Sequence, residues 1–220
     1  MLAAIGQLLP IAAATAVSSV PITAMLVILL SPRRRQAAIP FLVGWLVGIA
    51  AVTSVCALGA RLLPQPSESG SSVALGVTEV LVGGALVAGG LLTLRARVSR
   101  RTEARAWLGR VDALGPWSSF AVAVVLNLRP KALLLACAAG LVIRGASLTV
   151  GHATIVIAIY TVLAGSTIAV PIAMTMASPG RMEPRLVQAK GWLHRHARVI
   201  SAVVLLMVGV VAVGNGLTRL

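Results

Sequence analysis

Apolar stretches long enough to span a membrane alternate with short polar or basic connections along the whole chain. The six stretches cover about Leu2–Leu30, Ile39–Ala60, Val73–Leu94, residues 117–143, Gly151–Met176 and Ala197–Leu217. About 20 apolar residues in a helix cross the roughly 30 Å hydrocarbon core of a bilayer. The pattern therefore predicts an all-α membrane protein with six transmembrane helices.

The composition agrees with a membrane protein. The 220 residues are 58% hydrophobic and 11% charged, with a mean hydropathy of +0.98, whereas average domains carry about 25% charged residues. The formal net charge of +14 is of the kind found in nucleic-acid-binding proteins. The basic residues, however, lie in short connections between apolar stretches, which is typical of membrane topology signals, so no nucleic-acid partner is expected.

The distribution of basic residues predicts the orientation. Fourteen of the 19 lie on one side, at Arg33–Arg35, in residues 95–116, and in residues 177–196 with the adjoining Arg198. Three lie on the other side, and the remaining two, Arg129 and Lys131, lie within an apolar stretch. Because connections rich in Lys and Arg stay in the cytoplasm, both termini are expected outside it. Residues 98–114 carry apolar positions at helical spacing, which indicates a helix lying on the membrane surface, with a solvated loop as the alternative.

The stretch 117–143 is interrupted near its middle by the sequence N-L-R-P-K, residues 127–131. An Arg or Lys at the centre of a span costs about 2.5–3.5 kcal/mol even on insertion scales. Pro130 lacks an N–H, so the carbonyl of Leu126 loses its helical partner. Because a bared carbonyl in lipid must face protein or a water-filled cavity, the sequence predicts a broken helix that lines a polar site.

The first stretch carries a similar interruption. It is too long for one straight crossing and is interrupted by Pro10 and Pro21. A small polar residue, Ser18, stands three positions before Pro21, as in the fourth stretch. Pro21 is expected to free the carbonyl of Val17, and Ser18 and Ser19 are expected to satisfy part of the bared backbone.

Three crossings in each half make the two halves run in opposite directions. We expect a first three-helix repeat at residues 1–94, a basic cytoplasmic linker at residues 95–116 and a second three-helix repeat at residues 117–220. The broken helices then come first in each repeat. Paired broken helices in inverted repeats are typical of transporters whose substrate site lies at the bilayer midplane.

Few polar side chains lie within the predicted spans, and ionisable ones at such positions usually mark a pathway. Glu79 is the sole acidic residue in any predicted span. Lys131 follows Asn127 by one helical turn, so both are predicted to face one cavity, opened by Pro130, and to contact a polar or anionic headgroup. Glu79 is the predicted counter-charge or proton carrier. The alternative is a structural ion pair between Glu79 and Lys131 that holds two helices together.

Other chemistries lack the residues they need. One Glu and no Asp within the spans, with the histidines at span ends or in connections, predict no metal site. Cys56 and Cys137 form no C-x-x-C pair and are expected to be buried thiols without redox chemistry. The chain has no P-loop, so ATP hydrolysis is not expected. We therefore predict neither an enzyme nor a cofactor.

Two groups of motifs carry a resemblance to a known family. The first is S-x-x-P-I, L-L-S-P-R-R-R and F-L-x-G-W-L-x-G near the start, and the second is N-L-R-P-K-A-L-L-L-A in the fourth stretch. Together they resemble the Sap/GAP family, the sulfolipid- and glycopeptidolipid-addressing proteins of the LysE transporter superfamily, over essentially the whole chain. The resemblance implies an actinobacterial inner-membrane protein that moves large envelope glycolipids outward. Members of the superfamily otherwise export amino acids and metal ions.

The family motifs carry over onto particular residues of this chain. The positions that match are Ser18, Pro21, Gly44, Trp45, Asn127, Pro130 and Lys131. Glu79 has no counterpart in these motifs, so its role rests on the physical argument alone. Gly44 and Gly48 form a G-x-x-x-G pattern, which we interpret as a contact between helices of one chain rather than a dimer interface.

The expected function is export or flipping of an amphiphilic glycolipid across the inner membrane, with the headgroup in a polar cavity and the acyl chains in lipid. The energy would come from the proton gradient through Glu79 or from a partner. The alternatives are a small-solute exporter of the amino-acid type and a non-transporting accessory subunit of a lipid export complex. The expected partners are the lipid substrate and the bilayer, together with a second copy of the chain or the lipid-synthesis machinery.

Overall fold

The structure is a computed structural model that describes residues 2–61, 71–95, 115–146 and 148–218. All regular secondary structure in these ranges is helical, which confirms the predicted all-α class. The helices are α1 (Leu2–Ala16), α2 (Ser19–Leu30), α3 (Arg34–Ala60), α4 (Ser71–Arg95), α6 (Pro116–Leu126), α7 (Pro130–Gly145), α8 (Val150–Ala177) and α9 (Pro179–Leu217). The predicted surface helix at 98–114 lies outside the described residues.

Several of the helices are long and apolar enough to cross a membrane. In the described part of the chain, three single helices meet this condition, over Arg34–Arg61, Gly76–Arg95 and Val150–Ala177. Two further candidates are bent pairs: α1 with α2, at an angle of 50°, and α6 with α7, at an angle of 64°. By length and composition the described residues thus provide up to five spans, and the chain is a multi-pass membrane protein.

The sixth predicted span is part of a longer element. Helix α9 runs for 39 residues and takes in most of the basic connection predicted at residues 177–196. Its apolar part, Ala202–Leu217, is shorter than the other candidate spans. No proline follows Pro184, and the Leu, Gln, Ala, Lys and Arg residues that do follow it favour a helix, so nothing ends the helix at the membrane edge. The basic segment predicted as a connection is therefore helical and continuous with the last apolar stretch.

Both predicted breaks are present. Between α1 and α2, Ser18 is extended, with φ −76° and ψ 114°, and between α6 and α7, Arg129 is extended, with φ −69° and ψ 146°. Pro130 occupies the first position of α7, where its missing N–H would have no helical partner in any case. Pro21 lies in the first turn of α2, whereas Pro10 lies inside α1 and does not break it, contrary to expectation.

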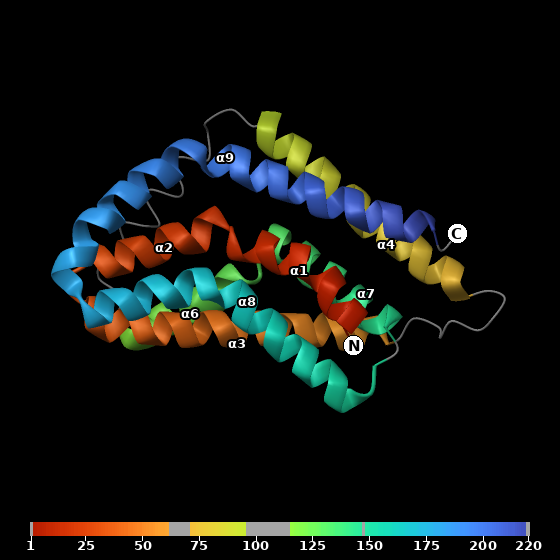
Figure 1. The fold of residues 1–220 in the computed structure, drawn as a ribbon, viewed down its shortest axis with the longest axis horizontal. Coiled ribbons are helices and arrows are strands. Elements are labelled where there is room, and N and C mark those ends of the chain that lie inside the picture. The colour runs from red at the N-terminus through yellow and green to blue at the C-terminus, as the bar shows by residue number, and fades with distance from the viewer. Residues whose placement is uncertain (1, 62–70, 96–114, 147, 219–220) are drawn as a thin grey trace.

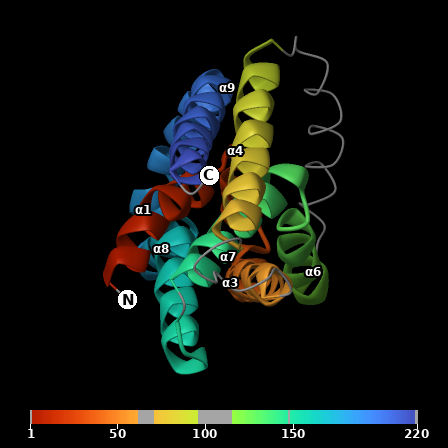
Figure 2. The same ribbon diagram turned by 90° about the vertical axis from the view of Figure 1, so that its right-hand side faces the viewer.

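The helices form two groups that pack against each other (Figures 1 and 2). Helix α4 lies along α9, and α3 packs against α6, α7 and α8. The α4–α9 contact depends on small residues, because a Cβ added at Gly83 would lie 2.8 Å from the backbone nitrogen of Val213. On α3, a Cβ added at Gly44 would lie 2.5 Å from the carbonyl oxygen of Phe120 in α6. The G-x-x-x-G pattern is therefore an internal contact, as predicted.

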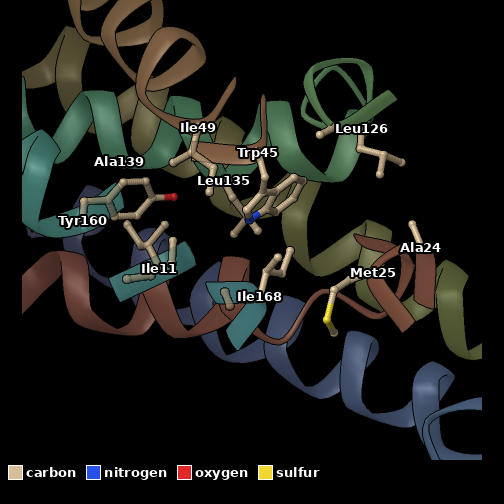
Figure 3. Packing of buried hydrophobic residues seen from close by; sticks show 14 of the residues in the cluster. Ile11, Ala24, Met25, Trp45, Ile49, Leu126, Leu135, Ala139, Tyr160 and Ile168 are labelled. Carbon is tan, nitrogen blue, oxygen red and sulfur yellow. The ribbon is translucent and has the colours of Figure 1, made fainter. Parts of the chain in front are cut away.

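A buried apolar cluster joins α1, α2, α3, α7 and α8 (Figure 3). Trp45, Leu135, Tyr160 and Ile168 belong to it and are each at most 2% exposed. The outward faces of the same helices carry exposed apolar side chains, as a lipid-facing surface requires. Val55 of α3 and Val162 of α8, each at 67% exposure, are examples.

The two ends of the bundle carry different segments. Figure 1 shows both termini at one end and the junctions between α2 and α3 and between α8 and α9 at the other. The Arg33–Arg35 segment, at the start of α3, therefore lies at the end opposite the termini.

Candidate functional site

The break in the fourth predicted span is closed by a side chain. The backbone N–H of Asn127 donates to the carbonyl of Val124 at 3.0 Å instead of continuing the α-helical pattern to Ala123. The side-chain Nδ2 of Asn127 donates to the carbonyl of Ala123 in its place, at 3.0 Å. Asn127 is 3% exposed and lies against Gly48 of α3, where an added Cβ would be 2.5 Å from Nδ2. The side chain of Asn127 thus caps one of the carbonyl groups that the end of α6 leaves free.

Lys131 lies in the first turn of α7, directly after Pro130. Its Nζ is buried and has no hydrogen-bond partner within the described part of the structure. Burying an ammonium group without a partner costs several kcal/mol. In the first turn of α7 the free N–H groups form the positive end of the helix dipole, and a second positive charge there adds to this cost. An anionic group beside Lys131 would remove the cost, and a helix N-terminus favours such a group.

A second buried donor lies on the neighbouring helix. Trp45 of α3 is 2% exposed, and its Nε1 has no hydrogen-bond partner among the described residues. Trp45 shares the buried cluster with Leu135 of α7 (Figure 3), and Leu135 follows Lys131 by one helical turn on the same face. Trp45 belongs to the F-L-x-G-W-L-x-G motif, but nothing in the sequence marks its indole as part of the site.

Glu79 lines a cavity between the α4–α9 pair and helices α1 and α7. Glu79 is 6% exposed, and the cavity is partly open to the surroundings. Its polar lining is completed by Gln7 of α1 and Asn215 of α9. The remaining lining residues are apolar: Pro10, Ile11, Val82, Ala138, Leu141, Val142, Val208, Val211 and Ala212. Sequence reasoning missed Gln7 and Asn215, because polar residues near span ends are ordinary.

The predicted site residues fall into two places. Among the described lining residues of the Glu79 cavity, neither Asn127 nor Lys131 is present. Ala138 does line the cavity, and it follows Lys131 by seven residues, which places it on the same face of α7 about 10 Å further along the axis. The Nζ of Lys131 makes no hydrogen bond to Glu79 or to any other described group. One face of α7 therefore connects a cationic position at the break to the cavity of Glu79.

The first break is sealed from another helix. Thr167 of α8 donates through Oγ1 to the carbonyl of Ala16 at 2.8 Å. Ser18, expected to satisfy the bared backbone itself, makes no side-chain cap hydrogen bond among the described residues. Pro21 is buried at the start of α2. The carbonyl capped by Thr167 is that of Ala16, one residue before the Val17 carbonyl that Pro21 was expected to free, and the donor comes from a residue far along the chain.

A second hydroxyl contact joins α1 to α8 just before this break. The hydroxyls of Thr15 and Tyr160 lie 2.9 Å apart, and Thr15 also donates to the carbonyl of Ile11 at 3.0 Å. Because Thr15 has one hydroxyl proton, Tyr160 is the donor to Thr15. The two contacts together fix the C-terminal end of α1 against α8.

Candidate metal ligands do not gather at either place. Among the described residues, no three His, Cys, Asp or Glu side chains are grouped so that they could hold a metal ion.

These features define a class: a multi-pass α-helical membrane protein with two broken spans and with buried ionisable residues beside and beyond the second break. The family model described as "Sap, sulfolipid-1-addressing protein" matches residues 8–218, nearly the whole chain. The chain belongs to this Sap family, which confirms the resemblance seen in its motifs. No curated protein and no solved structure matches the chain.

Proposed function

We propose that this Sap-family protein is an inner-membrane transporter that exports or flips an amphiphilic envelope glycolipid. The observation that carries the proposal is the buried Nζ of Lys131, without a hydrogen-bond partner among the described residues, at the N-terminal end of α7. A cation at such a position suits an anionic headgroup. The family description names a sulfolipid, a lipid with an anionic headgroup.

The proposed architecture has six crossings in two inverted halves, residues 1–94 and 117–220, as in the LysE superfamily. Support comes from the contacts between helices, compared after each helix of the first half is exchanged with its counterpart in the second half. The counterparts are α1 and α6, α2 and α7, α3 and α8, and α4 and α9. The exchange turns the contact of α1 with α8 into that of α6 with α3, and the contact of α2 with α9 into that of α7 with α4. The α4–α9 and α3–α8 contacts map onto themselves. Termini at one end also agree with an even number of crossings.

In this proposal the headgroup binds at the break, where Lys131 supplies charge and Asn127 offers its side-chain oxygen. Ser18 and Pro21 shape the corresponding break in the first half. The acyl chains stay in lipid. Support for a lateral opening comes from the Glu79 cavity, because Val211 is one of its lining residues and is 46% exposed on α9.

Glu79 is proposed as the counter-charge or proton carrier that couples export to the proton gradient. Glu79 is buried in a cavity beside the N-terminal half of α4. This supports the role, because an intramembrane carboxyl group beside other polar groups is typical of proton relays. The basic segments would face the cytoplasm and both termini the outside. The proposal involves no enzymatic step, cofactor or nucleic acid, and it leaves room for a second copy or the lipid-synthesis machinery as partner.

Lipid analysis of a deletion strain tests the proposal. The glycolipid pools of the inner membrane and of the cell surface are compared after deletion and after complementation with the wild type, Lys131→Met or Leu133→Met. Leu133 is 36% exposed on the same helix and serves as the matched control. We expect the deletion to move one glycolipid class from the surface pool to the inner membrane, and Lys131→Met alone to leave it there. Unchanged pools in the deletion strain would contradict the proposal.

A further inference from the structure

The fold brings the two cysteines of the chain together. Sγ of Cys56 in α3 and Sγ of Cys137 in α7 lie 3.4 Å apart, although 81 positions separate them in the sequence. Both residues are half-buried. The sequence has no C-x-x-C pair and no other sign of a dithiol, because tertiary packing rather than local spacing brings the two thiols together.

The helix backbones meet at this level. Gly140 follows Cys137 by one turn, and a Cβ added there would lie 2.8 Å from the carbonyl carbon of Cys56 and 2.9 Å from the nitrogen of Ala57. Further along, Ala60 and Leu141 pack together. A disulfide needs Cα atoms within about 7 Å and sulfurs about 2.0 Å apart. Sulfurs 3.4 Å apart, on helices whose backbones touch one turn away, favour such a bond, and a small movement of the two side chains would bring the sulfurs to bonding distance.

We propose that Cys56 and Cys137 are a redox modification site, at which a reversible disulfide crosslinks α3 to α7. Each thiol loses its proton and one electron, the S–S bond forms, and a lipid-soluble quinone takes up the two electrons and two protons to become a hydroquinone. A dithiol reductant reverses the reaction by thiol–disulfide exchange. A quinone is the fitting oxidant, because both sulfurs lie within apolar membrane-spanning helices.

The crosslink has a defined mechanical effect. Helix α3 belongs to residues 1–94 and α7 to residues 117–220, so the disulfide joins the two halves of the chain covalently. It also fixes the helix that begins at Pro130 and carries Lys131 against α3. The site itself does not depend on the proposed transport activity, since the bond is detected without any substrate.

The test uses the full chain with a specific protease site inserted between residues 104 and 105, within the basic linker. The purified protein is treated with decylubiquinone, blocked with N-ethylmaleimide, cleaved, and run on a gel with and without dithiothreitol. We expect the two halves to stay together after quinone treatment and to separate when dithiothreitol is added. Gel filtration of the protein before cleavage checks that the insertion leaves it folded.

Three variants control for the geometry. Cys56→Ser and Cys137→Ser should each give separated halves under both conditions. In the Cys56→Ser background, Ser54→Cys moves the thiol to another face of α3, and the halves should again separate. Separation of the wild-type halves after quinone treatment would overturn the proposal. A parallel sample is treated with copper phenanthroline, a general thiol oxidant. If copper phenanthroline joins the halves and quinone does not, the thiols are adjacent but insensitive to quinone, and the proposal is still overturned.

Discussion

The Oγ1 hydroxyl of Thr167 in α8 donates a 2.8 Å hydrogen bond to the carbonyl oxygen of Ala16, the last residue of α1. A broken helix inside a membrane bares carbonyl groups that water cannot reach, and each one must find a donor within the protein. Here the donor lies 151 positions along the chain. The shape of the first break is therefore a property of the α1–α8 contact as well as of the proline in α2.

Thr167→Val should destabilise the protein by about 1 kcal/mol, because it removes the donor but keeps the side-chain shape. Thr154→Val is the matched control on α8. Thr154 is exposed and donates within its own helix, to the carbonyl of Val150 at 2.9 Å, so its replacement should change stability little. Unfolding in detergent measures both variants. Equal effects of the two substitutions would contradict the role assigned to Thr167.

Gly48→Ala tests the packing of the second break. The new methyl group would lie 2.5 Å from Nδ2 of Asn127 and would push that side chain off the carbonyl of Ala123. Overpacking of this kind costs about 1–3 kcal/mol. Gly59→Ala, on the same helix with no described atom within 4 Å of the added Cβ, should be neutral or slightly stabilising. A tolerated Gly48→Ala would show that Asn127 is not held by α3.

Glu79→Gln and Lys131→Met should have independent effects on stability. In the described part of the structure, Lys131 makes no hydrogen bond to Glu79 and does not line its cavity. Independent sites add within about 0.5 kcal/mol, whereas contacting pairs couple by about 0.5–3 kcal/mol. Unfolding of both single variants and the double variant gives the coupling energy. Full recovery of stability and activity in the double variant would instead identify a structural ion pair.

Glu79→Gln should also change the pH response of transport. A carboxyl group that carries protons makes the transport rate depend on pH, and a carboxamide at the same position cannot titrate. We expect a slower rate with a flattened pH dependence. Asn215→Ala, in the same cavity, keeps the carboxyl group and should keep the pH dependence. Unaltered pH dependence in Glu79→Gln would remove the residue from the coupling mechanism.

Single cysteines test the predicted orientation. In a background without Cys56 and Cys137, Ser69→Cys should react with an impermeant thiol reagent added to intact cells, and Arg105→Cys should react only after lysis. Both positions lie outside the described residues, so the prediction rests on the charge distribution alone. The reverse labelling pattern would place the basic segments outside and contradict the orientation.

The breaks could be predicted from the sequence because their causes are local. A proline removes one N–H wherever it stands, so Pro130 and Pro21 mark interruptions without knowledge of the fold. Pro10 shows the limit of the rule, because α1 continues through it. The basic connection before the last apolar stretch was mistaken for a boundary, although its residues favour a helix and α9 runs through it.

The contacts that build the sites could not be predicted, because each one joins distant parts of the chain. No local signal brings Cys56 to Cys137, or Gln7 and Asn215 to Glu79. The charge of Lys131 within a span was visible in the sequence. That Lys131 does not line the described cavity of Glu79 became visible only in the structure.

The central claim, that Lys131 binds the headgroup of a transported lipid, is tested most directly by lipid translocation in proteoliposomes. The probe is a short-chain fluorescent lipid with a sulfated sugar headgroup, and quenching from outside reports the fraction that has crossed the bilayer. Wild type and Leu133→Met should translocate it equally, and Lys131→Met should be slower by about tenfold or more, because a hydrogen bond to a charged group contributes about 1.5–3 kcal/mol. Translocation by folded Lys131→Met at the wild-type rate, or none by the wild type, would contradict the account.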